Sequence, residues 1–220
     1  MDWQQLWLPI KISLQVALLA SVVTAVIGLA AAWWMTIKSF RGKLLVETVF
    51  LLPIVLPPTV VGFLLLVLLG GNSWIGRAIE WLFSAPLVFS WGAAVIAAVV
   101  VAFPLVYQSM KVGFASIDKD LEEAARSMGA NEWHVFRYIT LPLASRFLLS
   151  AYILGFARAL GEFGATLMIA GNIPGKTQTI PTAIYVAVDS GNLTMAWAWT
   201  FIIILISFLM LLITGRQQKR

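Results

Sequence analysis

The chain has 220 residues, of which 60% are hydrophobic and only 11% are charged, and its mean hydropathy is +0.91. Soluble domains are about 45–50% apolar and about 25% charged, so this composition excludes both a soluble globular domain and an intrinsically disordered chain. Because it has no cysteine and one histidine, His134, the sequence excludes a disulfide framework and disfavours a metal centre built from thiolates or imidazoles.

Long stretches without charge predict five membrane-spanning helices. A helix needs about 20 mostly apolar residues to cross the hydrocarbon core. Uncharged stretches of this length occur throughout the chain, and a further stretch is apolar except for Arg158 and Glu162. The spans are predicted near 12–36, 46–69, 88–109, 146–170 and 195–214, which gives a single all-α integral membrane domain over residues 10–214.

The positions of lysine and arginine predict that the N-terminus lies outside and the C-terminus in the cytoplasm, because positive residues favour the cytoplasmic ends of membrane spans. In this orientation the outer segments hold Lys11, Arg77 and Lys176. The inner segments hold Lys38, Arg41, Lys43, Lys111, Lys119, Arg126, Arg137, Arg146, Arg216, Lys219 and Arg220. This distribution accounts for the net charge of +5, so we expect no nucleic-acid partner.

The second predicted span contains Pro53, Pro57 and Pro58. Proline has no amide proton, so carbonyls one turn earlier lose their helical partners. Irregular backbone at membrane depth is tolerated only where it is buried in protein or lines a wet cavity. Two interpretations remain: a packed kink, or a translocation path or gate at Pro57, Pro58 and Thr59.

The longest inner segment, residues 111–145, predicts two short helices joined by a tight turn. Asp118 or Asp120 is suited to cap the first helix, which carries an apolar stripe, and Gly129 is suited to end it in a left-handed conformation. Asn131 can cap the second helix, which Pro142 would help to end. From periodicity alone, this hairpin could equally rest on lipid headgroups.

Arg158 and Glu162 lie four residues apart and therefore share one face of the fourth span. Each costs about 2.5–3.5 kcal/mol near the centre of a membrane helix, so a charge at this depth needs an explanation. The two interpretations are a neutralised internal pair that determines packing, and a charged group beside the pore.

The segment Ala170–Thr177 approaches the phosphate-loop pattern but does not satisfy it. Ala170 replaces the first glycine, Pro174 removes an amide from the cradle, and no predicted strand precedes the segment. The segment is also predicted to lie outside the cell, away from cytoplasmic ATP. We therefore expect no nucleotide site here.

Several motifs resemble the permease subunits of ATP-binding cassette (ABC) importers. Glu123-Ala124-Ala125, then Gly129, then Ile139-Thr140-Leu141-Pro142, is similar to the EAA loop of that family. Leu52–Gly62, Arg158–Thr166 and Asn172–Tyr185 resemble the molybdate branch of type I permeases. The resemblance implies that the loop docks on a separate ATP-binding subunit through Leu121, Glu122, Glu123, Ala124, Ala125, Met128, Gly129, Ile139, Leu141 and Pro142.

The resemblance further implies a type I permease fold in a prokaryotic cell membrane and import of molybdate or tungstate. The implied partners are two ATP-binding subunits, a second copy of the chain, a periplasmic or extracellular binding protein, and membrane lipid. ATP would be hydrolysed by the partner subunit, so we expect no catalytic residue, cofactor or metal in this chain. The candidate path or gate residues are Pro57, Pro58, Thr59, Arg158 and Glu162.

Two alternatives stand beside this hypothesis. The first keeps the importer and changes the cargo to sulfate, thiosulfate or another small anion. The second is a stand-alone ion-gradient transporter or channel, against which the EAA-like loop argues. An intramembrane hydrolase is a more distant reading, since the sequence offers no convincing pair of nucleophile and base.

Overall fold

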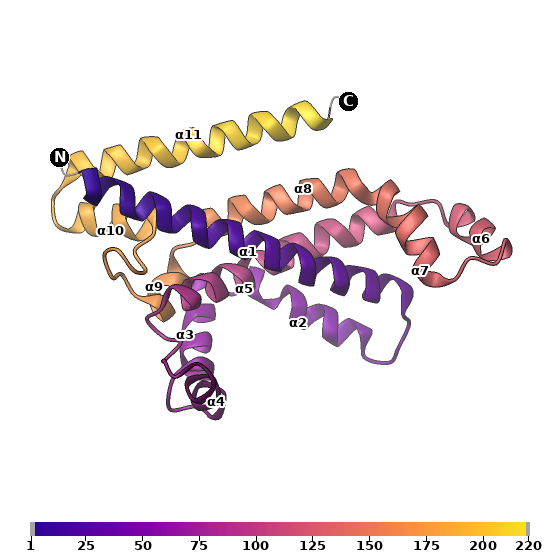
Figure 1. The fold of residues 1–220 in the computed structure, drawn as a ribbon, viewed down its shortest axis with the longest axis horizontal. Coiled ribbons are helices and arrows are strands. Elements are labelled where there is room, and N and C mark those ends of the chain that lie inside the picture. The colour runs from indigo at the N-terminus through magenta and orange to yellow at the C-terminus, as the bar shows by residue number, and fades with distance from the viewer. Residues whose placement is uncertain (1–2, 219–220) are drawn as a thin grey trace.

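The computed structural model describes residues 3–218, which form helices joined by short connections (Figure 1). In chain order they are α1 (Trp3–Ile37), α2 (Lys43–Val55), α3 (Pro58–Leu69), α4 (Trp74–Phe83), α5 (Trp91–Ala115), α6 (Lys119–Ser127), α7 (Glu132–Val135), the π-helical turn η1 (Phe136–Thr140), α8 (Leu141–Leu160), α9 (Gly164–Ala170), α10 (Ile180–Asp189) and α11 (Leu193–Gln218). No strand occurs among these described residues, so the predicted all-α class is confirmed.

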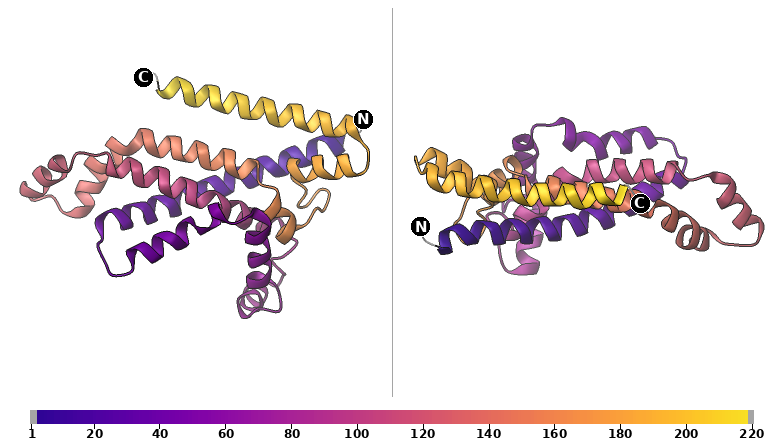
Figure 2. Two further views of the ribbon diagram at one scale, coloured as in Figure 1. Left: turned by 180° about the vertical axis from the view of Figure 1, so that it is seen from behind. Right: turned by 90° about the horizontal axis from the view of Figure 1, so that it is seen from above.

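Helices α1, α5 and α8 pack against one another and form the centre of the molecule (Figures 1 and 2). The surfaces that meet are rich in alanine, and Ala17, Ala20, Ala94, Ala98 and Ala151 are completely buried. Small side chains let helix backbones approach closely, and in lipid this packing replaces water exclusion as a source of association energy. The alanine-rich sequence therefore builds a core although its residues carry little apolar volume.

Four helical stretches are long and apolar enough to cross a membrane: α1, α5, the continuous helix Glu132–Leu160, and α11. Helices α2 and α3 pass the same test only as a pair, and they are bent by 115° at a short break. The predicted span 46–69 is therefore two helices in different directions, and the predicted total of five spans holds only if this pair counts as one.

The fourth predicted span, 146–170, differs from the structure at both ends. Its helix begins before residue 146, and it stops at Leu160, ten residues before the predicted end. The expectation that Pro142 helps to end a helix is wrong, because Pro142 lies in the first turn of α8 within a continuous helix. The π-helical turn just before it explains this: the Leu141 amide already bonds the carbonyl five residues earlier, at Phe136, so the helix is loosened where the ring enters.

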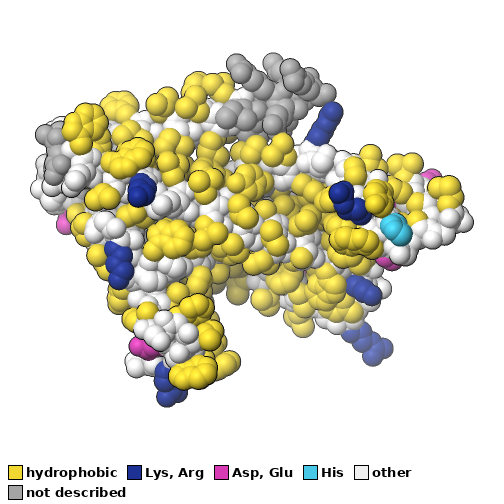
Figure 3. All heavy atoms as spheres, viewed as in Figure 1, with side chains coloured by type: hydrophobic (Ala, Val, Ile, Leu, Met, Phe, Trp, Pro, Cys, Tyr) yellow, Lys and Arg dark blue, Asp and Glu magenta, His cyan; other side chains and the backbone are white. Residues whose placement is uncertain are grey.

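Exposed apolar side chains cover most of the face seen in Figure 3, while charged side chains gather toward the ends of the molecule and on the α3–α4 arm. Helix α11 is tied to the bundle near its start, where the Trp199 ring N–H donates to the Leu6 carbonyl at 3.0 Å. Further along α11, Phe201, Leu205 and Phe208 are exposed. Such continuous apolar exposure is expected of a surface that meets lipid or another membrane subunit.

Candidate functional site

The break between α2 and α3 has a local cause in the proline pair. Leu56 adopts an extended conformation (φ −73°, ψ 142°), which is the region favoured by a residue that precedes proline. Pro57 is also extended, and Pro58 begins α3, where a missing amide proton leaves no helical bond unmade. Pro57, Pro58 and Thr59 are exposed on the surface of the single chain. The predicted irregularity is thus a complete change of helix direction rather than a kink.

A second break separates α8 from α9 and is organised by Glu162. The Glu162 carboxylate forms an ion pair with Arg158 at 2.7 Å, and its other oxygen accepts the Ala165 amide at 2.9 Å. The Glu162 side chain is only 1% exposed, whereas that of Arg158 is 33% exposed. The predicted ion pair is therefore present, but the expectation that both residues lie on one face of the span is wrong, because α8 ends at Leu160 and Glu162 lies in the break. Glu162 also accepts a hydrogen bond from the first turn of α9, a contact that the sequence does not indicate. Gly161 and Gly164, which flank the break, are the sequence feature that could have indicated an interruption of the helix here.

The two breaks lie against each other. A β-carbon added at Gly164 would lie 3.1 Å from Pro58 Cβ and 3.2 Å from the Thr59 amide nitrogen. One turn later, a β-carbon added at Gly62 would lie 2.7 Å from Ala165 Cα. Helices α3 and α9 therefore begin side by side and pack backbone to backbone. The structure brings the proline segment and the charged pair, predicted separately, into one site.

At the other end of the bundle, α6 and α7 form the predicted hairpin (Figure 1). Asp118 caps α6 by accepting the Asp120 amide at 3.0 Å, and Asn131 caps α7 by accepting the His134 amide at 2.9 Å. Gly129 has φ +90°, and the amides of Gly129 and Ala130 bond back to carbonyls in the last turn of α6. This arrangement is a Schellman motif, so the predicted left-handed turn is confirmed.

The hairpin side chains divide into an outward and an inward set. Leu121, Glu123, Ala124 and Met128 are exposed, and Met128 is 83% exposed. Ala125, predicted as part of the same contact stripe, is instead buried within the chain. At the far end of the predicted motif, Ile139 and Leu141 are half-buried and Pro142 is exposed. The exposed surface that a partner could contact therefore includes only some of the residues in the sequence motif.

Charged groups hold the inward side of the hairpin. Arg126 binds Glu132 through two hydrogen bonds, of 2.7 and 3.2 Å, and lies 3.4 Å from Glu122. The hydrogen bond to Glu132, together with the nearby charge of Glu122, raises the pKa of Arg126, so this guanidinium stays charged at every physiological pH. Deeper in the same end, Lys111 of α5 forms an ion pair with Glu47 of α2. The first set of contacts holds α6 and α7 together, and the second joins α5 to α2 at the same end of the bundle.

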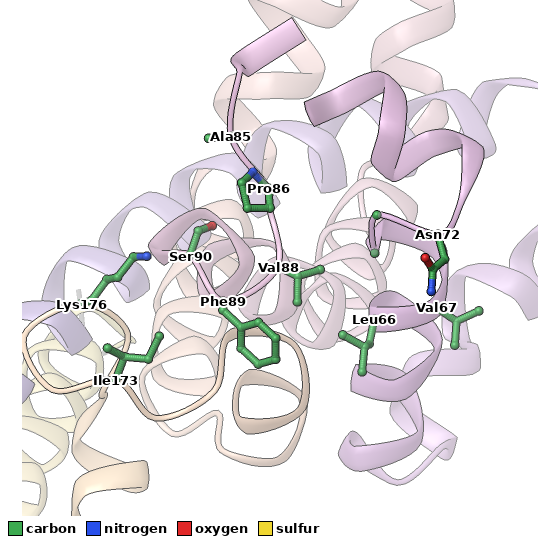
Figure 4. A pocket seen from close by; sticks show the side chains of 12 residues that line it. Leu66, Val67, Asn72, Ala85, Pro86, Val88, Phe89, Ser90, Ile173 and Lys176 are labelled. Carbon is green, nitrogen blue, oxygen red and sulfur yellow. The ribbon is translucent and has the colours of Figure 1, made fainter. Parts of the chain in front are cut away.

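The end opposite the hairpin carries the segment between α9 and α10, including the phosphate-loop-like sequence. This segment is held to α1 because the Ile180 amide donates to Ser13 Oγ at 2.7 Å inside the protein. It borders a cavity of about 870 Å³ that lies between the end of α3, the segment before α5, and Lys176. In Figure 4, Lys176 and Asn72 lie on opposite sides of this mostly apolar cavity, with Phe89 between them.

Residues 6–220 match the family described as "Binding-protein-dependent transport system inner membrane component". The chain belongs to this family. It is accordingly a multi-pass membrane component of a transport system, as the exposed apolar helices also indicate.

Curated relatives in this family are close in sequence. The chain is 59% identical over 96% of its length to the putative molybdenum transport system permease protein YvgM of Bacillus subtilis, covering 92% of that protein. It is 44% identical over 84% of its length to the molybdenum transport system permease protein ModB of Escherichia coli K12, covering 80% of it. The sulfate transport system permease protein CysW of Synechococcus elongatus is more distant, at 33% identity over 96% of this chain and 76% of that protein.

Solved structures share the fold at low sequence identity. A bacterial ABC transporter involved in the import of alginate matches with a TM-score of 0.79 and 16% identity, covering 100% of this chain and 80% of that one. The MetNI methionine ABC transporter matches with a TM-score of 0.73 and 16% identity, covering 98% of this chain and 97% of that one. The fold is therefore that of a type I ABC importer permease, as predicted.

Proposed function

We propose that the chain is the membrane-spanning subunit of an ATP-driven importer that moves molybdate or tungstate into the cell. The observation that carries the proposal is the 59% identity, over nearly the whole chain, to a putative molybdenum permease, against 33% for a sulfate permease. Import of sulfate, thiosulfate or another small anion by the same machine is the second candidate. Molybdate and tungstate are nearly identical tetrahedral dianions, so the proposal covers both.

The proposed assembly contains two copies of this chain, two ATP-binding subunits and an external binding protein. The exposed side of α6, with Glu123 and Met128, supports a docking role for the hairpin, because exposed charge next to apolar surface suits a partner groove. Hydrolysis of ATP is assigned to the ATP-binding subunits, and this chain is proposed to hold no cofactor, metal or catalytic residue. The hairpin lies in the cytoplasm and the N-terminus outside in this arrangement, in keeping with the positive residues near the hairpin.

The proposed translocation path runs beside the paired helix breaks. Pro57, Pro58 and Thr59 are exposed on the single chain, and broken helices within a membrane are tolerated where they meet protein or a wet cavity. Discontinuous helices also form the substrate sites of many transporters. Arg158, one-third exposed, belongs to the same site through Glu162.

The deciding experiment is uptake of molybdate by vesicles that contain the chain, its ATP-binding subunit and the binding protein, with sulfate as competitor. The proposal requires uptake that depends on both ATP and the binding protein and that excess sulfate does not inhibit. Equal uptake of sulfate would move the assignment to the second candidate. Uptake by the chain alone, driven by an ion gradient, would replace the importer by a stand-alone transporter.

A further inference from the structure

Thr140 is a polar residue that is almost completely buried, at 5% exposure, where the hairpin joins the membrane helix. Its hydroxyl donates to Glu122 Oε1 at 2.7 Å, which joins the root of α8 to the middle of α6 across 18 residues of sequence. A hydrogen bond to a charged carboxylate is about twice as strong as one between neutral groups. This contact is therefore a strong link between two elements that the chain connects only through a turn.

The π-helical turn accompanies this placement of Thr140. The Leu141 amide bonds the Phe136 carbonyl, five residues back, and the Thr140 hydroxyl also lies 3.4 Å from the Val135 carbonyl. Single π-helical turns occur frequently at functional sites, since they interrupt the regular ladder at an energetic cost. Here the interruption is located at the residue that reaches α6.

Glu122 is held in place from its other side. Arg126, one turn later on α6, lies 3.4 Å from the second Glu122 oxygen and binds Glu132 at the start of α7. These groups border a cavity of about 260 Å³ beneath the hairpin, which Thr36 of α1 also lines. The link is thus part of a charged network on the inward side of the hairpin, away from the surface proposed for the ATP-binding subunit.

The covalent route from α6 to α8 passes through Gly129, which has φ +90°, and through the turn that ends at Asn131. The backbone hydrogen bonds of the Schellman motif and the bond from Arg126 to Glu132 hold this turn, but they reach only the start of α7. The bond from Thr140 to Glu122 adds a direct link from α6 to the start of α8.

We propose that Thr140 and Glu122 form a latch that makes α6 and α8 move as one body, so that displacement of the hairpin reaches the helix break at Glu162. Both are positioning residues, and the inference rests on the proposed function, in which an ATP-binding subunit moves the hairpin. The latch lies at one end of α8, and the paired breaks lie at the other.

The test uses the full chain assembled with its ATP-binding subunit and binding protein in vesicles. Thr140→Val removes the hydroxyl while keeping the shape, Thr140→Ser restores the hydroxyl, and Glu122→Ala removes the acceptor on the more exposed partner. The matched control is Thr36→Val, since Thr36 lines the same cavity and its hydroxyl donates to the Ala32 carbonyl of its own helix, at 2.8 Å. Molybdate taken up per ATP hydrolysed is the first readout.

Uptake per ATP is expected to fall about tenfold in Thr140→Val and in Glu122→Ala, because a hydrogen bond to a charged group biases an equilibrium by at least that factor. The double variant should be no worse than either single one. Thr140→Ser and Thr36→Val should behave like the wild type, and ATP hydrolysis should continue in all of them. Should Thr140→Val fail to assemble, Glu122→Ala carries the same comparison.

A second readout does not depend on the transported substrate. The chain contains no cysteine, so spin labels can be placed on Ser127→Cys of α6 and Leu149→Cys of α8, both at exposed positions. Labelled chain diluted into an excess of unlabelled chain then reports the distance between α6 and α8 within one copy. A narrow distance distribution is expected in the wild type and a broad one in Thr140→Val. Either wild-type uptake per ATP or a wild-type distribution width in the latch variants overturns the latch. Absence of molybdate uptake by the wild type counts against the proposed function instead, and the distance measurement then still decides the latch.

Discussion

Gly164, at the start of α9, lies so close to Thr59, at the start of α3, that a β-carbon on residue 164 would be 3.2 Å from the Thr59 amide nitrogen. Contacts this short leave no room for a side chain unless one of the two backbones moves. The two interrupted helices therefore pack directly against each other at their interruptions.

Substitution of Gly164 should separate these breaks. Gly164→Val places a branched side chain against Pro58 and Thr59, and overpacking of this kind costs about 1–3 kcal/mol. We expect a lower melting temperature of the purified chain and loss of molybdate uptake. Gly161→Ala is the control in the same break, because its β-carbon would lie 3.7 Å from the Ala157 carbonyl, an ordinary contact. Equal effects of the two substitutions would contradict the joined-break interpretation.

Glu162 has two functions that separate variants should resolve. Glu162→Gln keeps an oxygen for the Ala165 amide but loses the charge opposite Arg158, whereas Glu162→Ala loses both. We expect Glu162→Ala to be the more destabilising, by about 1–3 kcal/mol, a range reduced from that of a fully buried pair because Arg158 is partly exposed. The melting temperatures of the purified variants test this, with Glu162→Ala expected to be lower than Glu162→Gln.

The ion pair itself predicts non-additive losses. Removal of Glu162 alone leaves the Arg158 guanidinium without its counterion at 2.7 Å, so Arg158→Gln combined with Glu162→Gln should be less harmful than the sum of the single changes. A double-mutant cycle on unfolding and on uptake measures this coupling. If the losses simply add, the two residues do not act as a pair. If uptake is lost while assembly is retained, the pair has a role in the path beyond packing.

Gly129 should tolerate very few substitutions. At φ +90° a side chain is strained by about 1–2 kcal/mol, so Gly129→Asp should insert into the membrane normally but weaken association with the ATP-binding subunit. Gly129→Asn is the milder variant, since asparagine is more readily accommodated in left-handed backbone. Co-purification of the ATP-binding subunit is the measurement. Full association of the Asp variant would remove the turn from the coupling mechanism.

Glu123 should matter for the partner rather than for this chain's own stability. It is exposed and takes part in none of the ion pairs formed by the described residues, unlike its neighbour Glu122. Glu123→Lys should therefore leave the melting temperature unchanged while reducing association with the ATP-binding subunit and molybdate uptake. Ser127→Lys, at another exposed position of α6, controls for added positive charge. A hairpin that merely rests on lipid predicts no loss in either variant.

The long helices could be predicted from the sequence because a membrane span depends on local composition. Local capping chemistry likewise located the turn at Gly129 and the caps at Asp118 and Asn131, all of which the structure contains. The size of the bend at Pro57 could not be predicted in this way. Proline removes an amide proton, but the 115° angle depends on the packing of α3 against α9, which is distant in sequence.

Contacts between side chains on different helices could not be predicted from local sequence patterns either. Arg158 and Glu162 were paired correctly because they are only four residues apart in the sequence, whereas the bond from Thr140 to Glu122 joins two elements and leaves no periodic pattern. The error at Pro142 has the same origin. Pro142 does not end the helix because a π-helical turn precedes it, and no residue pattern predicts that turn.

Because α3 packs on a helix that is made much later, the α2–α3 segment can enter the membrane before it can complete its packing. As a linear sequence, residues 46–69 are apolar enough to enter the bilayer as one segment. The helix on which α3 mainly packs, α9, leaves the ribosome only after α5 and α8 have been made. Until then α3 lacks the helix against which it packs in the folded chain. A chain that ends before residue 164 would thus contain α3 without the helix on which it packs.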